Sequence, residues 1–166
     1  MKDTTNQSEN KERMPRGIRN CNPLNIRANG TAWQGMTAEQ TDKSFVQFKS
    51  MAYGFRAAFI TLYNYMTKHR LTTIAQIVRR WAPESENNTQ AYIDAVCQRT
   101  RIERNATLDW FDKESMTAIV KAMVWVENGG PPLTPPEGGG LEDTIDKSID
   151  EGYEMACKSY QVMLKK

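Results

Sequence analysis

Apolar side chains recur at helical spacing in five segments of this 166-residue chain, and this periodicity limits it to a mainly helical fold. The clearest segment follows Ser50, a residue able to cap a helix, and places large apolar side chains three or four positions apart. The five helices are expected at about 51–69, 74–81, 89–100, 112–127 and 141–164. Pro83 ends the second of them, and Asp112 can cap the fourth.

The pattern changes between residues 29 and 48. Asn29-Gly30 is a turn signal, and two short apolar segments follow at 33–35 and 45–48. Polar residues separate them, among which Glu39 and Asp42 are expected to be solvated. The sequence therefore predicts a small β-hairpin beside the helices, in a fold that is mainly α within the α+β class.

Residues 16–27 read Arg-Gly-Ile-Arg-Asn-Cys-Asn-Pro-Leu-Asn-Ile-Arg, a pattern that fits neither a helix nor an alternating strand. Asparagine amides both donate and accept hydrogen bonds, so this run predicts a shaped loop. Two interpretations stay open: the loop presents Asn20, Asn22 and Asn25 to a ligand, or it only braces the fold.

The two ends of the chain differ in composition from its middle. Residues 1–14 are polar and charged and are predicted to be a disordered tail. Residues 15–129 contain the predicted core, whereas residues 130–140 are rich in proline and glycine, which is typical of a linker. The amphipathic helix within 141–166 is expected to fold back on the core or to bind a protein partner through residues 141–164.

Charge and cysteine usage exclude several classes of function. The 22 basic and 20 acidic residues leave a net charge of +2, which gives no electrostatic case for nucleic acid or an anionic membrane. Three scattered cysteines suggest neither a disulfide framework nor a metal site, and no cofactor motif is present. No apolar stretch resembles a signal peptide or a membrane span, so we expect cytoplasmic synthesis and delivery by another route.

Carboxylates are the remaining candidates for chemistry, and Glu127 is the strongest. It falls on the apolar stripe of its helix and in the last turn, where burial and the negative end of the helix dipole both raise a carboxyl pKa. A carboxylic acid that stays protonated can donate its proton to the leaving oxygen of a glycoside. The alternative interpretation is a helix that frays before Glu127 and leaves it in water.

Other side chains could assist such a reaction. Glu84 and Glu86 lie in the loop after Pro83 and are candidates for a second carboxylate, although a solvated loop explains them equally well. Aromatic residues could stack on sugar faces, although most belong to a core in a domain of this size. The five candidates are Trp33, Phe48, Tyr53, Trp81 and Tyr92.

An ordered series of motifs resembles a family of phage and phage-like proteins described as virion structural or lysozyme-like. That family pairs a GIRNNNPGNIR loop with RWAP..EN.T..YI, and the likeness covers about residues 16–100. It departs at Cys21 and Leu24, where Asn and Gly are usual. The motifs here are GIRNCNPLNIR at 17–27, WQG at 33–35, FVQF at 45–48, YGFRA at 53–57, IVRRWAP at 77–83 and ENNTQAYI at 86–93.

The series is similar, more distantly, to flagellar-type glucosaminidases and goose-type lysozymes. In those families the catalytic glutamate ends a helix that precedes the Asn-rich loop, whereas here the comparable helix, 118–129, follows it. The resemblance therefore implies a circularly permuted lysozyme-like domain, with a small β-hairpin and with Glu127 as the acid. It also implies that the loop from Asn20 to Asn25 and the segment from Thr89 to Tyr92 line the cleft.

The expected function is cleavage of peptidoglycan glycan strands by a muramidase, glucosaminidase or lytic transglycosylase of phage or phage-like origin, without a metal or organic cofactor. The rival from another class is a non-enzymatic phage structural or wall-binding protein of the same fold. A nucleic-acid-binding domain around Arg79 and Arg80 is the weakest alternative, because those two residues are its main support.

Overall fold

The computed structural model describes residues 14–130 and 140–164, without the side chains of 140–143 and 161–164. Six helices account for most of the described residues, so the prediction of a mainly helical fold is confirmed. Their bounds are α2 Arg16–Arg19, α3 Met51–Thr67, α4 Ile74–Trp81, α5 Thr89–Thr100, α6 Lys113–Glu127 and α7 Gly140–Leu164. The predictions of a disordered tail over 1–14 and a linker over 130–140 fall almost entirely outside the described residues.

Four helices begin at a side-chain cap, of which the Asn88 cap was not predicted from the sequence. In each case an oxygen of the cap accepts a hydrogen bond from the backbone N–H three residues later, which satisfies one of the free donors of the first turn. The caps are Ser50 for α3, Thr73 for α4, Asn88 for α5 and Asp112 for α6. Local chemistry therefore fixes where these helices start.

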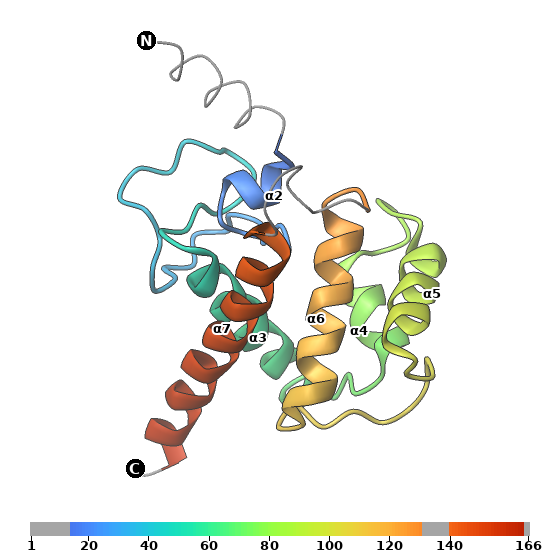
Figure 1. The fold of residues 1–166 in the computed structure, drawn as a ribbon. Coiled ribbons are helices and arrows are strands. Elements are labelled where there is room, and N and C mark those ends of the chain that lie inside the picture. Colours follow the sequence, from blue (N-terminus) through green and yellow to red (C-terminus); the bar gives the residue numbers. More distant parts are fainter. Residues whose placement is uncertain (1–13, 131–139, 165–166) are drawn as a thin grey trace.

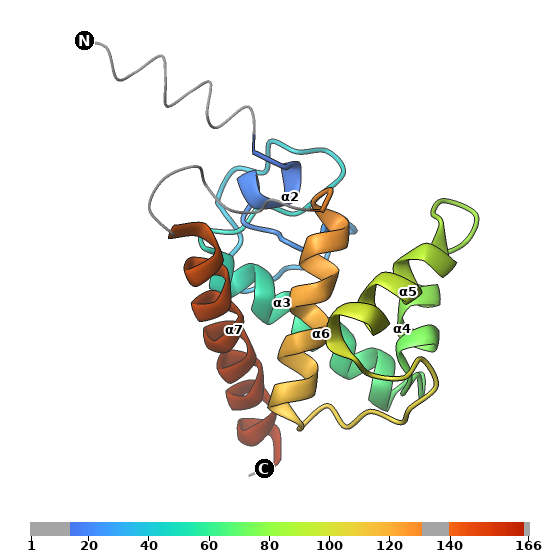
Figure 2. The same ribbon diagram turned by 45° about the vertical axis from the view of Figure 1, so that its right-hand side comes forward.

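The long helix α3 lies at the centre of the molecule, as Figure 1 shows. α7 packs along α3, and α6 lies beside α7 with α4 and α5 on its other side (Figures 1 and 2). α6 runs upward in these views, so its C-terminal end reaches α2 and the loops before α3. This arrangement brings the Asn-rich loop and Glu127 to the same end of the bundle.

α7 is part of the main core. Tyr153 packs edge-on against Phe59 of α3, with ring centroids 5.1 Å apart, and its hydroxyl donates to the backbone oxygen of Trp110 at 3.0 Å. The Trp110 indole N–H donates in turn to Phe59 O at 3.0 Å. Gly152 allows the two helices to approach, because a Cβ there would lie 2.5 Å from Phe55 Cβ and 2.8 Å from Arg56 N. Of the two roles expected for this helix, the structure shows folding back on the core.

The predicted β-hairpin does not form as two strands within residues 14–130. The chain there makes two isolated antiparallel bridges instead, Arg27 with Phe45 and Met36 with Phe48. The second bridge joins Phe48, in the segment 45–48, to the residue that follows the segment 33–35. Side-chain contacts supplement the few backbone bonds of this region. The Gln40 side chain donates to Gln47 O and accepts from Gln47 N, and Asn22 Nδ2 donates to Val46 O at 2.9 Å.

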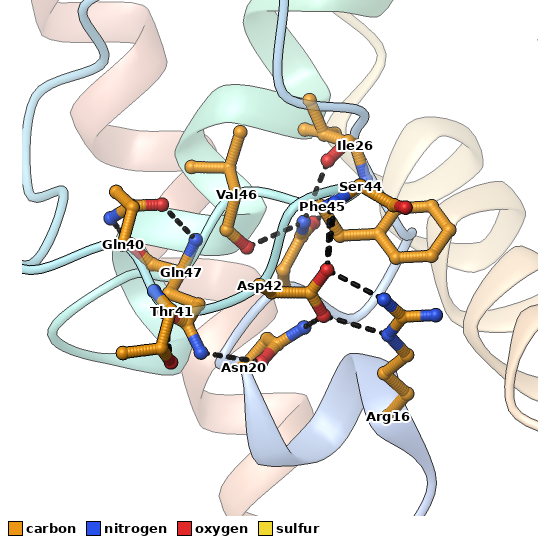
Figure 3. A network of polar contacts seen from close by, with 11 residues as sticks. Arg16, Asn20, Ile26, Gln40, Thr41, Asp42, Ser44, Phe45, Val46 and Gln47 are labelled. Carbon is orange, nitrogen blue, oxygen red and sulfur yellow. Dashed lines mark hydrogen bonds and ion pairs between the residues drawn. The ribbon is translucent and has the colours of Figure 1, made fainter.

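Asp42 is the centre of a polar network that holds this irregular region to α2 (Figure 3). Its side chain is only 8% exposed, so the expectation of a solvated carboxylate is wrong. The Arg16 guanidinium donates to both carboxylate oxygens at 2.6 and 2.7 Å, and Asn20 Nδ2 donates at 3.0 Å. Backbone N–H groups of Ser44 and Phe45 complete the set. Every donor favours the ionised form, so the pKa of Asp42 lies well below its usual 3.8.

We expect Asp42→Asn to lower the free energy of unfolding by about 1–2 kcal/mol, because one amide oxygen cannot accept bonds from all these donors. The folded protein holds Asp42 at a lower pKa than the unfolded chain does. Its stabilisation is therefore complete above the usual pKa of 3.8 and declines as the pH falls below it. Urea unfolding at pH 7 and pH 3 measures both effects, and the variant should differ less from wild type at pH 3. The control is the exposed Glu39→Gln, and an equal loss in both variants would contradict the assignment.

Among the described helices, none is both long and apolar enough to cross a membrane. The three cysteines, Cys21, Cys97 and Cys157, form no disulfide and are each partly buried.

Candidate active site

The Asn-rich loop and the end of α6 are joined directly. Asn25, which adopts a left-handed backbone conformation with φ 53°, donates from Nδ2 to Glu127 O at 3.2 Å and to Glu127 Oε2 at 3.1 Å. Asn128 Nδ2 donates to Pro23 O at 2.8 Å. Gly17 of α2 leaves room for this junction, since a Cβ there would lie 2.8 Å from the Oδ1 atoms of both asparagines. The loop thus fixes the orientation of the Glu127 carboxyl.

Two aromatic side chains hold the other oxygen of the same carboxyl. The Trp81 indole N–H, from the end of α4, donates to Glu127 Oε1 at 3.2 Å. The Tyr92 hydroxyl, from α5, donates to the same oxygen at 3.2 Å. Side chains from the loop, α4 and α5 therefore converge on one carboxyl group at the end of α6.

Burial and hydrogen bonding act on Glu127 in opposite directions. Removal from water disfavours the charged form and raises its pKa, whereas the bonds from Asn25, Tyr92 and Trp81 favour the charged form and lower it. Burial is the larger effect, so the pKa of Glu127 lies above its usual 4.5. Because the loss of water outweighs three donors, the group retains a proton at a pH where a solvated glutamate has lost it.

The partners of Glu127 leave its proton available. An indole N–H and an amide N–H can only donate, so of the three bonded groups only the Tyr92 hydroxyl could accept a bond from the protonated acid. Oε1 already accepts two bonds and Oε2 accepts one. We therefore expect the proton on Oε2.

Glu127 lies in the wall of a cavity of about 650 Å³, a volume sufficient for sugar-sized ligands. The wall draws on the loops before α3, on α3, on α4 and its following loop, and on the end of α6. The lining residues are Asn25, Ile26, Arg27, Asn29, Thr31, Trp33, Phe45, Thr61, Asn64, Tyr65, His69, Arg80, Trp81, Ala82, Glu86, Asn87 and Glu127.

The candidates predicted from sequence divide into two groups. Asn25, Trp33, Trp81 and Glu86 lie on the cavity wall with Glu127, and Tyr92 is bonded to Glu127 without lining the cavity. The others do not line the cavity. Asn20 is bonded to Asp42 and Gln47, Asn22 to Ile26 and Val46, and Thr89 to Ala82 O, and all three are buried. We correct their expected role from substrate contacts to structural supports, and Glu84 is exposed elsewhere.

The positions of Cys21 and Leu24 explain how the loop departs from the related motif without losing its shape. The left-handed conformations fall on Cys21, with φ 51°, and on Asn25, whereas Leu24 has no positive φ and is fully buried. The loop therefore turns around Leu24, and the position where glycine is usual supplies an apolar anchor.

Sequence reasoning missed one end of the cavity wall. Tyr65 falls within a predicted helix, and Arg80 was considered only as support for nucleic-acid binding. His69 was expected on the surface and is exposed, and all three line the cavity. The sequence signal was weak, because Arg79 and Arg80 are adjacent and both exposed, and only the orientation of α4 places one of them on the cavity wall. As for metals, the described residues hold no cluster of three or more His, Cys, Asp or Glu that could bind an ion.

We expect Tyr92→Phe to raise the pKa of Glu127 further, because it removes a hydrogen bond that favours the carboxylate and keeps the buried ring. The titration midpoint of the Glu127 carboxyl carbon, followed by NMR, measures the change. Tyr63→Phe is the control, since Tyr63 packs against Trp110 and Tyr160, away from Glu127. An unchanged or lower midpoint in Tyr92→Phe would show that the hydroxyl does not act on the carboxylate.

Comparison with known proteins identifies relatives of this chain. No protein-family model matches it. Protein P5 of Pseudoalteromonas phage PM2 is 41% identical over 141 residues, which cover 83% of this chain and 82% of the phage protein. The chain belongs to the P5 family. The match to protein P5 leaves out about 17% of the 166 residues. Trp81, Tyr92 and Glu127 all lie farther than that from both ends of the chain, so the match spans them wherever it begins.

Proposed function

We propose that this protein cleaves the glycan strands of peptidoglycan, with Glu127 as general acid. The observation that carries this proposal is a single carboxyl of raised pKa, held by Asn25, Trp81 and Tyr92 in the wall of a sugar-sized cavity. Such an acid is what glycoside cleavage requires, because the leaving oxygen must receive a proton as its bond to carbon breaks.

The reaction proceeds in two steps at Glu127. In the first, the carboxyl gives its proton to the glycosidic oxygen, the bond from that oxygen to the anomeric carbon breaks, and Glu127 becomes a carboxylate. The three donated hydrogen bonds stabilise that carboxylate. In the second step an attacking hydroxyl bonds to the anomeric carbon and returns a proton to Glu127, which restores the acid.

The source of that hydroxyl distinguishes hydrolysis from lytic transglycosylation. A two-carboxylate hydrolase needs a second acid close to the first. Glu86 lines the same cavity, but its carboxylate lies 3.7 Å from Arg27 Nη2 in an ion pair. Transglycosylation needs only one acid and a hydroxyl of the sugar itself. A cavity with one unpaired carboxyl therefore favours attack by the sugar's own hydroxyl.

We also propose that the fold is a circularly permuted lysozyme-like domain. Support comes from the direct junction between the Asn-rich loop and the end of α6, two segments about a hundred residues apart that meet through Asn25 and Asn128. In the related families a glutamate-bearing helix precedes such a loop. Packing is indifferent to chain order when the same contacts form.

The phage origin of protein P5 suggests the setting of the reaction. A phage must cross the cell wall of its host, and a wall-cleaving protein carried in the virion serves that need. We propose that this chain is virion-associated or is delivered to the wall by another route.

Incubation of the purified protein with isolated peptidoglycan tests the proposal, with mass spectrometry of the soluble products. Fragments with anhydro ends indicate transglycosylation, and reducing ends indicate hydrolysis. Binding to the wall without released fragments, across several wall types, would favour the rival function of a non-enzymatic structural or wall-binding protein.

A further inference from the structure

The end of the cavity formed by α3 and α4 carries a basic and aromatic wall that the proposed cleavage step does not use. Tyr65 and Asn64 come from the last turns of α3, His69 follows that helix, and Arg80 comes from α4. We propose that this wall is a subsite for a carboxylate carried by the glycan strand, with Arg80 as its principal contact. The inference rests on the proposed function and specifies which part of the substrate the cavity recognises.

A row of ring contacts leads from the acid to this wall. The Trp81 indole, bonded to Glu127, lies edge-on to the Tyr65 ring with centroids 6.0 Å apart. Tyr65 in turn contacts the His69 ring at 6.5 Å. The basic wall is thus separated from Glu127 by one intervening indole. A strand cleaved at Glu127 would place a neighbouring sugar, not the scissile bond, beside this wall.

Arg80 is held in place without an acidic partner. Its guanidinium lies over the Tyr65 ring, 5.1 Å from the centroid, which orients the charge along the cavity wall. Among the side chains of residues 14–130 and 144–160, the structure gives Arg80 no carboxylate within ion-pair distance. The Asn64 amide, which also lines the cavity, likewise has no side-chain hydrogen bond in that part of the protein.

The other charges of the cavity do not neutralise Arg80. Glu86 is paired with Arg27, and burial favours the neutral form of Glu127. One guanidinium, one amide and one imidazole therefore remain for a ligand. A planar guanidinium binds carboxylates through paired hydrogen bonds, and an oriented one does so at low entropic cost.

Peptidoglycan supplies such carboxylates at regular intervals. Every second sugar bears a lactyl ether whose carboxyl group is either free or extended by a stem peptide. The free form carries its carboxylate on the lactyl group, close to the sugar ring. The extended form carries carboxylates on the peptide, a short chain away from the ring. A neutral oligomer of N-acetylglucosamine has the same backbone without any carboxylate.

Binding of three saccharides of equal length to a Glu127→Gln background tests the proposal without cleavage. The ligands are strands with stem peptides, strands stripped of peptides but retaining the lactyl carboxylate, and the neutral oligomer. Adding Arg80→Gln should weaken binding of at least one acidic ligand by about tenfold, as expected for one charge-assisted contact, and leave the neutral oligomer unaffected. Loss confined to the strands with stem peptides identifies a peptide carboxylate, and loss confined to the stripped strands identifies the free lactyl carboxylate. Loss for both acidic ligands shows that the subsite accepts either carboxylate.

Two further variants isolate the charge. Arg79→Gln, in the adjacent exposed position outside the cavity, should change none of the three affinities. Arg80→Lys keeps the charge but loses the paired geometry, so it should retain part of the preference for acidic ligands.

The outcomes separate this inference from the proposed function. If Arg80→Gln changes none of the three affinities while the wild-type protein cleaves the strands, the subsite alone is overturned. An equal loss for acidic and neutral ligands also overturns it, because Arg80 would then support the fold of the cavity. A wild-type protein that neither binds nor cleaves any saccharide overturns both.

Discussion

Glu127→Gln is expected to reduce the release of fragments from peptidoglycan by about 10²–10⁴-fold, the usual contribution of a general acid. Glutamine is close to glutamate in size, and its amide oxygen can still accept the bonds from Trp81 and Tyr92. It cannot give a proton to a leaving oxygen. The amount of released fragments measures the effect, and circular dichroism of both proteins checks that the fold is unchanged.

Glu84→Gln is the matched control, because Glu84 is exposed and does not line the cavity. It should keep wild-type activity. Equal activity in wild type and Glu127→Gln would contradict the assignment and direct attention to Glu86, the other acid of the cavity.

The pH dependence of the wild-type rate follows from the same group. Only protonated Glu127 can act as the acid, so activity should fall as the pH rises through its pKa. Since burial raises that pKa above 4.5, the fall should lie at a higher pH than a solvated glutamate would give. Any residual activity of Glu127→Gln should lack this fall.

Gly152→Leu is expected to be the most destabilising single change considered, with a loss of about 3 kcal/mol or more in the free energy of unfolding. A Cβ at this position would lie 2.8 Å from Arg56 N and 2.9 Å from Ala52 O, both backbone atoms of α3. Backbone cannot rotate away as a side chain can, so α7 would have to separate from α3. Leucine favours helices more than glycine does, so the loss would come from packing.

Glu151→Leu introduces the same side chain one residue earlier, on the exposed face of α7. It should change stability by no more than about 0.5 kcal/mol. Thermal unfolding separates the two variants, since about 3 kcal/mol corresponds to a shift of about 6–12 °C in a protein of this size. Equal stabilities would mean that α7 is not packed on α3 as the structure has it.

Helix positions were readable from the sequence because they depend on neighbours in the chain. Ser50, Thr73, Asn88 and Asp112 cap the helices that follow them, and Thr89–Thr100 forms the helix that its apolar stripe indicates. Glu127 could also be singled out locally, because helical periodicity alone places it on the apolar stripe in the last turn. Its partners on α4, α5 and the loop could not be identified from that pattern.

The irregular region between residues 29 and 48 could not be predicted from local sequence in the same way. Its strands were expected from short apolar segments, but the segments make only two isolated bridges, and the side chains of Asp42 and Gln40 bind several of the backbone groups there. Asp42 looked solvated because its partner Arg16 is 26 residues away. A local pattern does not reveal a partner at that separation.

Sequence by itself determined the helical class, the helix starts and the strongest candidate acid. Tertiary structure decided which asparagine faces the acid, which of Arg79 and Arg80 lines the cavity, and where α7 packs. The physical reason is the range of the interactions. Caps and periodicity act within one or two turns, whereas the contact of Asn25 with Glu127 joins residues 102 apart and exists only once the helices have packed.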